Sequence, residues 1–237
     1  MNSQSLGIFF LILTKRNKIL RLNKYLAQNL QISRRNADEI IAAGHVKINR
    51  QKVSVGTIVT KDDFVEVDGE VIKSRSTHEY YKFYKPKGYI CSHEQQGDSP
   101  IIFDLIGKQY LKFGGRLDKD SEGLMLLSTD GDWLNNMFNA KNKITKKYII
   151  KIKSPLPKGK KFKQNINHNG EVLKITNYKL INKYTYEVAL KTGKNHEIRR
   201  IFRFNNLKIT TLKRNRIGKY SLKDLSPGDL VKINIDE

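Results

Sequence analysis

Two helical patterns lie near the start of the region where hydrophobic residues recur regularly. The first pattern predicts an amphipathic helix, because its apolar residues recur with the spacing of one helix face: Leu22, Tyr25, Leu26 and Leu30. Ser33 is a preferred capping residue for a second helix, which we expect to end at Gly44 because glycine adopts a positive φ at little cost. The buried face of this second helix is predicted to hold Ala37, Ile40 and Ile41.

Short strands are predicted after these helices, over residues 45–49, 53–55, 64–67 and 70–73. The last two form a hairpin, because Asp68-Gly69 between them is a preferred two-residue turn. Residues 75–79 have no apolar periodicity and are interpreted as a linker. We therefore expect a non-core extension over residues 1–18, a small domain over 19–74 and a larger domain over 80–237.

The larger domain combines strand patterns with two helical patterns. Strands are predicted at 81–84, 89–91, 124–127 and 184–190, and helices at 132–138 and 196–204. The segment Lys85-Pro86-Lys87-Gly88 separates the first two strands, with proline and glycine at positions typical of a type I turn. Together the two domains indicate an α+β protein.

The chain is strongly basic. Lys and Arg number 45 against 23 Asp and Glu in 237 residues, a formal net charge of +22, which favours a polyanionic partner such as nucleic acid or an anionic membrane surface. Arg34 and Arg35 stand at a helix N-terminus, where they oppose the helix dipole, so we expect them to bind a partner. Residues 139–183 contain thirteen lysines and one acid, Glu171, and either follow an RNA backbone or form a solvated surface.

Cysteine content and apolar runs indicate the compartment. Cys91 is the single cysteine, which excludes an intramolecular disulfide and a cysteine-built zinc site and fits a reducing environment. The apolar run over residues 6–13 is far shorter than the about 20 residues that span a bilayer, and basic residues follow it rather than precede it. We expect a cytoplasmic protein without a membrane span; an organellar transit peptide at residues 1–18 is the alternative, because the first acidic residue is Asp38.

Three carboxylates are the strongest candidates for chemistry: Asp118, Asp120 and Glu122, in the loop over residues 114–123, here the carboxylate loop. Their spacing matches part of a calcium loop, but its twelfth position is Thr129 rather than a bidentate Glu, which disfavours calcium. A magnesium-dependent nuclease needs a second carboxylate cluster, and the sequence has no such pattern. A glycosidase pair stays open on these residues alone, although Trp133 is the only tryptophan.

Five segments in register resemble the RsuA-type pseudouridine synthases of ribosomal RNA. The sequence Gly-Arg-Leu-Asp at 115–118, which runs on as DKDSEGLMLLSTDGD, is similar to the catalytic motif of that family. The other four segments are KPKGYICS at 85–92, Lys146-Lys147-Tyr148, TGKNHEIRR at 192–200 and LKRNRIG at 212–218. Residues 20–73, with the pattern SRRNADEIIAAGHVKINRQKV, resemble the alpha-L RNA-binding motif, so that the resemblance covers residues 20–233.

This resemblance implies a fold and an activity. The fold is a small α/β alpha-L RNA-binding domain followed by a catalytic domain built on a mixed, mainly antiparallel sheet with flanking helices. The activity is the isomerisation of one uridine of ribosomal RNA to pseudouridine, without a metal or a cofactor. The expected partner is ribosomal RNA or a pre-ribosomal particle, and the protein is expected to act as a monomer without an obligate protein partner.

The same resemblance assigns roles to individual residues. Asp118 attacks C1′ or removes the 2′ proton of a flipped uridine, two routes that stay open. Arg199 pairs with Asp118, and Tyr148 stacks on the flipped base and lies where the C5 proton must leave. The remaining expected RNA contacts are Arg116, Arg34, Arg35, Lys47, Lys146 and Asn195.

Two residues depart from the family pattern, Glu197 where Gln is usual and Thr192 where Glu is usual. Glu197 stands two residues from Arg199, so we expect it to compete with Asp118 for that guanidinium. The stretch KDSEGLMLLSTDGD and the Asn-Asn-Met-Phe helix resemble the large-subunit enzymes of the family more than the small-subunit one, which implies a large-subunit target. Two other functions stay open: a catalytically silent RNA-binding or ribosome-assembly factor on the same fold, and an Asp/Glu hydrolase.

Overall fold

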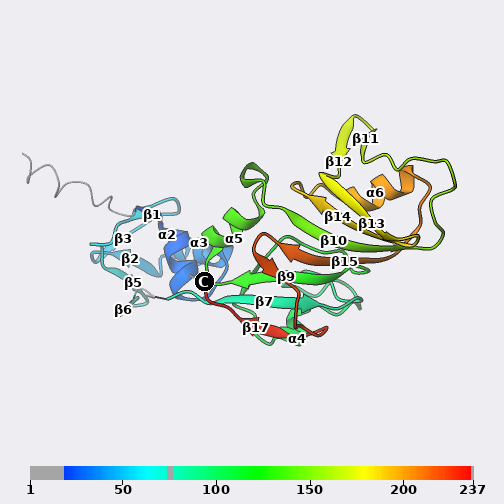
Figure 1. Cartoon of the computed structure of the whole chain (residues 1–237). Coiled ribbons are helices and arrows are strands. Elements are labelled where there is room, and N and C mark those ends of the chain that lie inside the picture. Colours follow the sequence, from blue (N-terminus) through cyan, green and yellow to red (C-terminus); the bar gives the residue numbers. More distant parts are fainter. Residues whose placement is uncertain (1–18, 74–76, 236–237) are drawn as a thin grey trace, which may run out of the picture. The chain divides into compact units, whose positions relative to one another are not determined.

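The computed structural model describes residues 19–73 and 77–235, which form two compact units, one ending at Thr77 and the other beginning at His78 (Figure 1). The expected extension over residues 1–18 and residues 75–76 of the expected linker lie outside the described residues. None of the described helices is both long enough and apolar enough to cross a membrane.

The N-terminal unit contains both predicted helices, α2 (Leu22–Asn29) and α3 (Arg34–Ala42). The Ser33 side chain accepts a hydrogen bond from the Asn36 backbone N–H, which confirms Ser33 as the N-cap of α3. A two-stranded sheet pairs β1 (Leu20–Arg21) with β4 (Ile58–Val59). The core of this unit consists of Leu22, Leu26, Ala37, Ile41, Val46, Ile48, Val59 and Val65.

A four-stranded sheet completes this unit, in the order β3 (Gln51–Lys52), β2 (Val46–Ile48), β5 (Val65–Val67) and β6 (Glu70–Val71). Asp68 and Gly69 both have positive φ, +51° and +86°, which confirms the predicted hairpin between β5 and β6. The predicted strand over residues 53–55 is wrong. Asn49 and Arg50 also have positive φ and turn the chain tightly after β2, so β3 pairs with β2 earlier and ends before residue 53.

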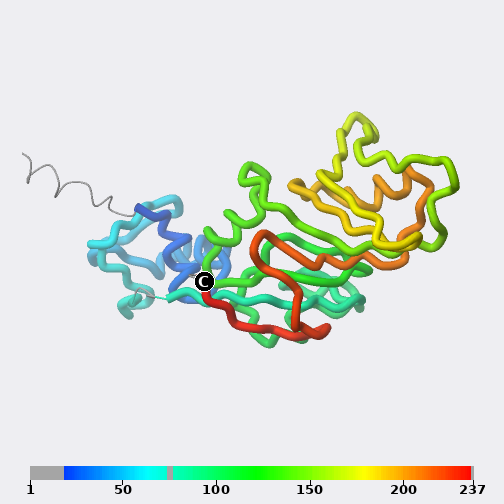
Figure 2. The backbone as a smooth tube through the Cα atoms, viewed as in Figure 1, coloured from blue at the N-terminus to red at the C-terminus, as the bar shows by residue number. Residues whose placement is uncertain are grey.

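The larger unit is built on a nine-stranded sheet. Its main path runs β13 (Asn177–Asn182), β14 (Thr185–Leu190), β10 (Lys146–Ile152), β15 (Ile209–Ile217), β9 (Glu122–Ser128), β7 (Tyr80–Lys85) and β17 (Leu230–Lys232), with β8 (Lys112–Gly114) beside β9 and β16 (Tyr220–Ser221) beside β15. Only β9 with β15 is parallel, so the fold is the expected α+β type with a mixed, mainly antiparallel sheet. Figure 2 shows the chain returning late in the sequence, through β15, to run between β9 and β10.

Both faces of β9 are buried, which explains its continuous apolar sequence. Leu124 and Leu126 face a second core that includes Leu134 of α5 (Gly131–Phe138), whereas Met125 and Leu127 face the main core. The main core also takes in α4 (Ile102–Ile106) and α6 (Glu197–Phe204), the latter through Ile198, Ile201 and Phe202.

One predicted strand of this unit is wrong. Residues 89–91 make only an isolated bridge, from Ile90 to Ile101, instead of a strand. The physical reason lies in the preceding turn, where the Gly88 N–H donates a 2.8 Å hydrogen bond to the Lys119 carbonyl. This bond directs the segment toward the carboxylate loop and away from the sheet.

A hairpin that was not predicted lies within the lysine-rich segment. It consists of β11 (Asn165–His168) and β12 (Glu171–Lys174), joined by Asn169 and Gly170 with φ of +54° and +77°. Asn-Gly is a strong signal for a two-residue turn, so the sequence contained the evidence for this hairpin. Its flanking residues are too polar to show a clear strand alternation.

Candidate active site

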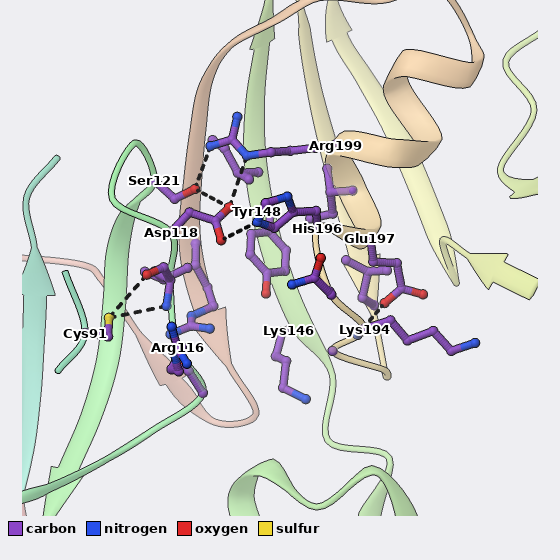
Figure 3. Close-up of a pocket in the computed structure, with 18 of the residues that line it drawn as sticks. Cys91, Arg116, Asp118, Ser121, Lys146, Tyr148, Lys194, His196, Glu197 and Arg199 are labelled. Carbon is purple, nitrogen blue, oxygen red and sulfur yellow. Dashed lines mark hydrogen bonds and ion pairs between the residues drawn. The ribbon is translucent and has the colours of Figure 1, made fainter. Parts of the chain in front are cut away.

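A cavity of about 550 Å³ lies between the carboxylate loop, strands β10 and β15, and the start of α6 (Figure 3). Segments that are far apart in the sequence meet around it, and all five motif segments contribute to its wall. The sequence-predicted residues that line it are Arg116, Asp118, Lys146, Tyr148, Asn195 and Arg199.

The Asp118 carboxylate is contacted on both of its oxygens. Arg199 Nε, on α6, donates to Oδ2 at 3.1 Å, and the Ser121 hydroxyl lies 3.4 Å from the same oxygen. A terminal nitrogen of Arg199 also donates to Ser121 Oγ at 2.8 Å, which closes a three-residue network (Figure 3). The other oxygen, Oδ1, lies 3.4 Å from Nε2 of His196. Asp118 therefore has a fixed orientation while 37% of its side chain stays exposed to the cavity and solvent.

Two buried side chains contact the backbone of the carboxylate loop. The Lys85 ammonium is fully buried and donates to the carbonyls of Ser121 at 2.7 Å and Pro86 at 3.0 Å, and burial lowers the pKa of Lys85 to about 8. Cys91 Sγ lies 3.3 Å from the Leu117 carbonyl oxygen and 3.4 Å from its backbone nitrogen. Burial raises the pKa of the Cys91 thiol, which keeps it protonated and in a packing role.

Strand β10 supplies one wall of the cavity. Tyr148 faces the cavity, and within the described part of the chain its hydroxyl makes no hydrogen bond. Lys146, two residues earlier on the same face, is buried and donates to the Thr192 carbonyl at 3.4 Å. Burial, together with the nearby guanidinium of Arg214, lowers the pKa of Lys146. The cavity wall on this side therefore contains two cations, Lys146 and Arg214, and the Tyr148 hydroxyl.

Arg214 is a structural cation of this wall that sequence reasoning missed. It is almost fully buried, and its guanidinium donates to the carbonyls of Leu124 and Gly115, both at 2.7 Å. It thereby ties β15 to β9 and to the start of the carboxylate loop. The motif LKRNRIG contained this residue, but only the pairing of β15 with β9 shows which of its cations points inward.

The expected competition of Glu197 for Arg199 does not occur in the structure. The buried Glu197 carboxylate accepts hydrogen bonds from the Thr192 hydroxyl at 2.8 Å and from the Lys194 backbone N–H at 3.2 Å. The two residues that depart from the family pattern, Thr192 and Glu197, thus bind each other and organise the loop before α6. Arg199 stays with Asp118, because it lies on the opposite side of the helix start (Figure 3).

His196 and Ser121 are the other functional candidates that sequence reasoning missed. His196 adopts a left-handed φ of +47° at the N-terminus of α6, which brings its ring toward Asp118. Ser121 is buried within the carboxylate loop and bridges Asp118 and Arg199. Both residues stand inside the quoted motifs, but their contacts depend on loop geometry that spacing alone does not define.

Arg34, Arg35 and Lys47 belong to the other unit and are exposed there. Neither arginine forms a hydrogen bond or an ion pair with any residue that the structure describes. Both guanidinium groups at the start of α3 are therefore exposed and unpaired within the described part of the chain.

The three carboxylates of the carboxylate loop do not converge on one point. Asp118 binds Arg199, Glu122 accepts from the Tyr84 hydroxyl at 3.1 Å, and Asp120 is exposed. Among residues 19–73 and 77–235 there is no group of three or more His, Cys, Asp or Glu side chains arranged to hold a metal ion.

Comparisons with known proteins find similarity over most of the chain. The profile of the RNA pseudouridylate synthase family matches residues 79–204, and that of the S4 domain matches residues 20–65. A ribosomal small subunit pseudouridine synthase A of Vibrio parahaemolyticus is 33% identical over 89% of this chain and 94% of its own length. The dual-specificity RNA pseudouridine synthase RluF of Escherichia coli is 30% identical over 92% of this chain and 77% of its own. A crystal structure of a pseudouridylate synthase superposes with a TM-score of 0.63 at 27% identity, covering 92% of this chain and 97% of that one.

Proposed function

The chain belongs to the RNA pseudouridylate synthase family and carries an N-terminal S4 domain, and on this basis we propose that it isomerises a uridine of ribosomal RNA to pseudouridine. The observation that carries the proposal is the Asp118 carboxylate, held by Arg199 and Ser121 at the edge of a cavity that also contains Tyr148. The proposed partner is ribosomal RNA or a pre-ribosomal particle. We propose that the protein acts as a monomer in the cytoplasm.

Isomerisation requires a series of changes at one nucleotide. The bond from C1′ to N1 breaks, the uracil rotates within the cavity, and C1′ bonds to C5, after which C5 loses its proton and N1 gains one. Asp118 starts this sequence either by attacking C1′ or by removing the 2′ proton. Both routes need an ionised carboxylate within reach of the sugar, and the exposed part of Asp118 meets that need.

Arg199 supports the ionised form of Asp118 when RNA fills the cavity. Displacing water from a carboxylate disfavours its charge, whereas a guanidinium in contact with it restores the balance. The contact here is direct, at 3.1 Å, and comes from a helix anchored in the main core. Arg199 therefore holds both the charge and the direction of the carboxylate during the reaction.

A uridine within folded RNA must leave its stack before Asp118 can reach C1′, at a cost of a few kcal/mol. Stacking on an aromatic face returns about 1–3 kcal/mol. Tyr148 and Phe138 both line the cavity, and Tyr148 is proposed to stack on the flipped base. Tyr148 is also proposed to lie where the C5 proton must leave. Arg116, exposed at the cavity rim, is proposed to fill the gap that the flipped base leaves.

Ribosomal RNA as the substrate rests on the relatives and on charge. Relatives are named as ribosomal small subunit and dual-specificity enzymes, whereas the sequence pattern favoured a large-subunit target, so the names do not support that preference. The S4 domain adds the exposed Arg34, Arg35 and Lys47 as proposed RNA contacts. Mapping the pseudouridines that disappear from both subunits in a deletion strain assigns the target, and a lost site in the small subunit would refute the large-subunit preference.

The decisive test of the activity is Asp118→Asn. This change keeps the size of the side chain and removes its charge, so we expect no release of tritium from C5-labelled uridine in rRNA, with rRNA affinity retained at the same salt concentration. Wild-type turnover in this variant would refute the proposed mechanism. A wild-type protein that binds rRNA without releasing tritium would instead support the silent RNA-binding factor, and cleavage of a glycosidic bond without isomerisation would support the hydrolase.

A further inference from the structure

Two motif strands place alternate residues on opposite faces of the sheet. On β10, Lys146 and Tyr148 face the cavity, whereas Lys147, Ile149 and Lys151 face the other way. The same division holds on β15. Leu212 and Arg214 face the cavity, whereas Thr211, Lys213 and Asn215 point away from it. The proposed reaction thus uses only one face of these strands.

The face opposite the cavity is defined here as the rear face. Strand registers place residues of four strands side by side on it, because Ile149 pairs with Glu187 and Lys213, and Glu187 in turn pairs with Lys179. The members of the rear face are Lys147, Ile149, Lys151, Asn177, Lys179, Asn182, Thr185, Glu187, Ala189, Thr211, Lys213 and Arg216.

The rear face is strongly basic. It carries four lysines, one arginine and one acid, Glu187, whose carboxylate lies 3.5 Å from the Lys147 ammonium. Lys151, Lys179 and Lys213 form no ion pair with any described residue. Glu187 lies opposite Lys179 and Glu122 of β9 lies opposite Lys213 in the strand registers, but neither acid forms an ion pair with these lysines.

The described part of the chain leaves this face uncovered. Every residue of β10 and β14 that points to the cavity side is buried, whereas every rear-face residue of the same strands is half-buried or exposed. Helix α5 packs through Leu134 against Leu124 and Leu126 of β9, whereas α4 and α6 pack in the main core. No rear-face residue belongs to any of the cores. In Figure 1, α6 lies beside β13 and β14, and its apolar residues enter the main core on the cavity side.

We propose that the rear face is a second RNA-binding surface, which contacts the phosphate backbone of rRNA outside the segment held in the cavity. This proposal rests on the proposed function, because it takes rRNA as the ligand. Charge favours RNA, since the three unpaired lysines complement phosphates. Side-chain chemistry disfavours a protein, because the buried centre of a protein interface is apolar and enriched in aromatic residues and Met, and the apolar members here are only Ile149 and Ala189.

The test compares two variants with the same change in charge. The rear-face variant is Lys151→Gln with Lys179→Gln and Lys213→Gln. The control is Lys61→Gln with Lys208→Gln and Lys223→Gln, three exposed lysines dispersed over the molecule. Each phosphate contact contributes about 0.7–0.9 to the slope of log affinity against log salt, so the rear-face variant should lose about two units of slope on long rRNA and bind at least about tenfold more weakly at 0.1 M salt. The control should stay within about threefold of wild type.

A minimal RNA stem-loop that fills only the cavity separates this proposal from the proposed function. Tritium release from C5-labelled uridine in that short RNA should be the same for wild type and the rear-face variant, which also shows that the variant is folded. Equal affinity of wild type and rear-face variant for long rRNA, or an equal loss in the control, would overturn the proposal. Unchanged RNA affinity with weaker binding to protein-containing pre-ribosomal particles would assign the face to an acidic protein and overturn it as well. Failure of the wild type to release tritium would refute the proposed function without affecting the comparison of affinities.

Discussion

Arg199 reaches two groups of the proposed catalytic network through different nitrogens, Nε to Asp118 and a terminal nitrogen to Ser121. A lysine has one compact ammonium on a flexible stem and cannot make both contacts in this planar arrangement. The network therefore depends on the shape of the guanidinium as well as on its charge. Because Arg199 is anchored on α6, which packs in the main core, its role is separable from RNA docking.

In Arg199→Lys we expect kcat for pseudouridine formation to fall by about a hundredfold, comparable to the loss of one positioned charge-stabilising donor. The affinity for rRNA should change by less than about twofold, because the positive charge remains. Ser121→Ala is the graded control, since it removes only one contact of the guanidinium, and its kcat should fall by about tenfold or less. Single-turnover tritium release and filter binding measure the two quantities, and a wild-type kcat in Arg199→Lys would contradict the assignment.

Lys85 makes stability depend on alkaline pH. Its pKa in the folded protein is about 8 because of burial, below the ordinary lysine value of 10.5, so between these values the unfolded chain holds a proton that the folded protein has released. Stability therefore rises with pH in that interval, by up to about 1.4 kcal/mol per pH unit, and Lys85 adds no slope below pH 8. Lys146 contributes in the same direction, because burial lowers its pKa too.

Between pH 8 and about pH 9.5, Lys85 and Lys146 raise the free energy of unfolding by urea, whereas the raised pKa of Cys91 opposes this rise above about pH 8.5, where the thiol of the unfolded chain ionises. Lys85→Met should reduce this rise, while Lys87→Met, at an exposed neighbouring position, should leave it unchanged. An undiminished rise in Lys85→Met would show that Lys85 does not titrate as its burial requires.

At the scale of elements, local signals predicted what local chemistry determines. The cap at Ser33, the Asp68-Gly69 turn and the apolar run of β9 each depend on a few neighbouring residues, and all three are confirmed. The strand predicted over residues 89–91 was wrong because the conformation of this segment depends on the hydrogen bond from Gly88 to Lys119 of the carboxylate loop. These two residues lie 31 positions apart in the sequence. The motifs predicted which residues line the cavity, but the contacts of His196 and Arg214 depend on how separate elements meet.

At Gly123 the backbones of β9 and β15 approach each other closely. A Cβ built on Gly123 would lie 2.3 Å from the carbonyl oxygen and 2.7 Å from the backbone nitrogen of Arg214, and its φ is +119°. Because these neighbours are backbone atoms, the strand itself would have to move. The pairing in question, Gly123 with Arg214, is part of the one parallel contact in the sheet, and it holds the carboxylate loop against the cavity.

We therefore expect Gly123→Ala to destabilise the protein by about 3 kcal/mol or more, or to prevent folding. Gly170→Ala is the matched control, since Gly170 also has a positive φ, +77°, but has no atom within 4 Å of a built Cβ. It should lose only about 1–2 kcal/mol from backbone strain. Urea unfolding of both variants measures the difference, and equal stability losses would mean that contact with β15 does not constrain this position.

At the scale of the whole molecule, composition predicted the class of ligand but not where it binds. The net charge of +22 is a sum over the chain, whereas a binding surface depends on which side chains share a face. Alternation on β10 separates Lys146, which is buried beside the cavity, from Lys147 on the rear face, although they are neighbours in sequence. The segment over residues 139–183 therefore divides into cations that serve the cavity, the rear face and solvent.

The N-terminal unit, which contains the S4 domain, can be tested by itself, because its proposed role in RNA docking is separable from the chemistry in the other unit. Arg34 and Arg35 begin α3, are exposed, and have no partner among the described residues. Their positive charge opposes the helix dipole, so replacing both with alanine should not lower the stability of the unit.

We expect Arg34→Ala with Arg35→Ala to weaken rRNA binding and to reduce selection of the target uridine, while tritium release from a short stem-loop at saturating concentration stays at the wild-type rate. Lys61→Ala with Lys73→Ala is the control of equal charge within the same unit. Normal rRNA affinity in the arginine variant, or an equal loss in the lysine control, would mean that the start of α3 serves a partner other than rRNA.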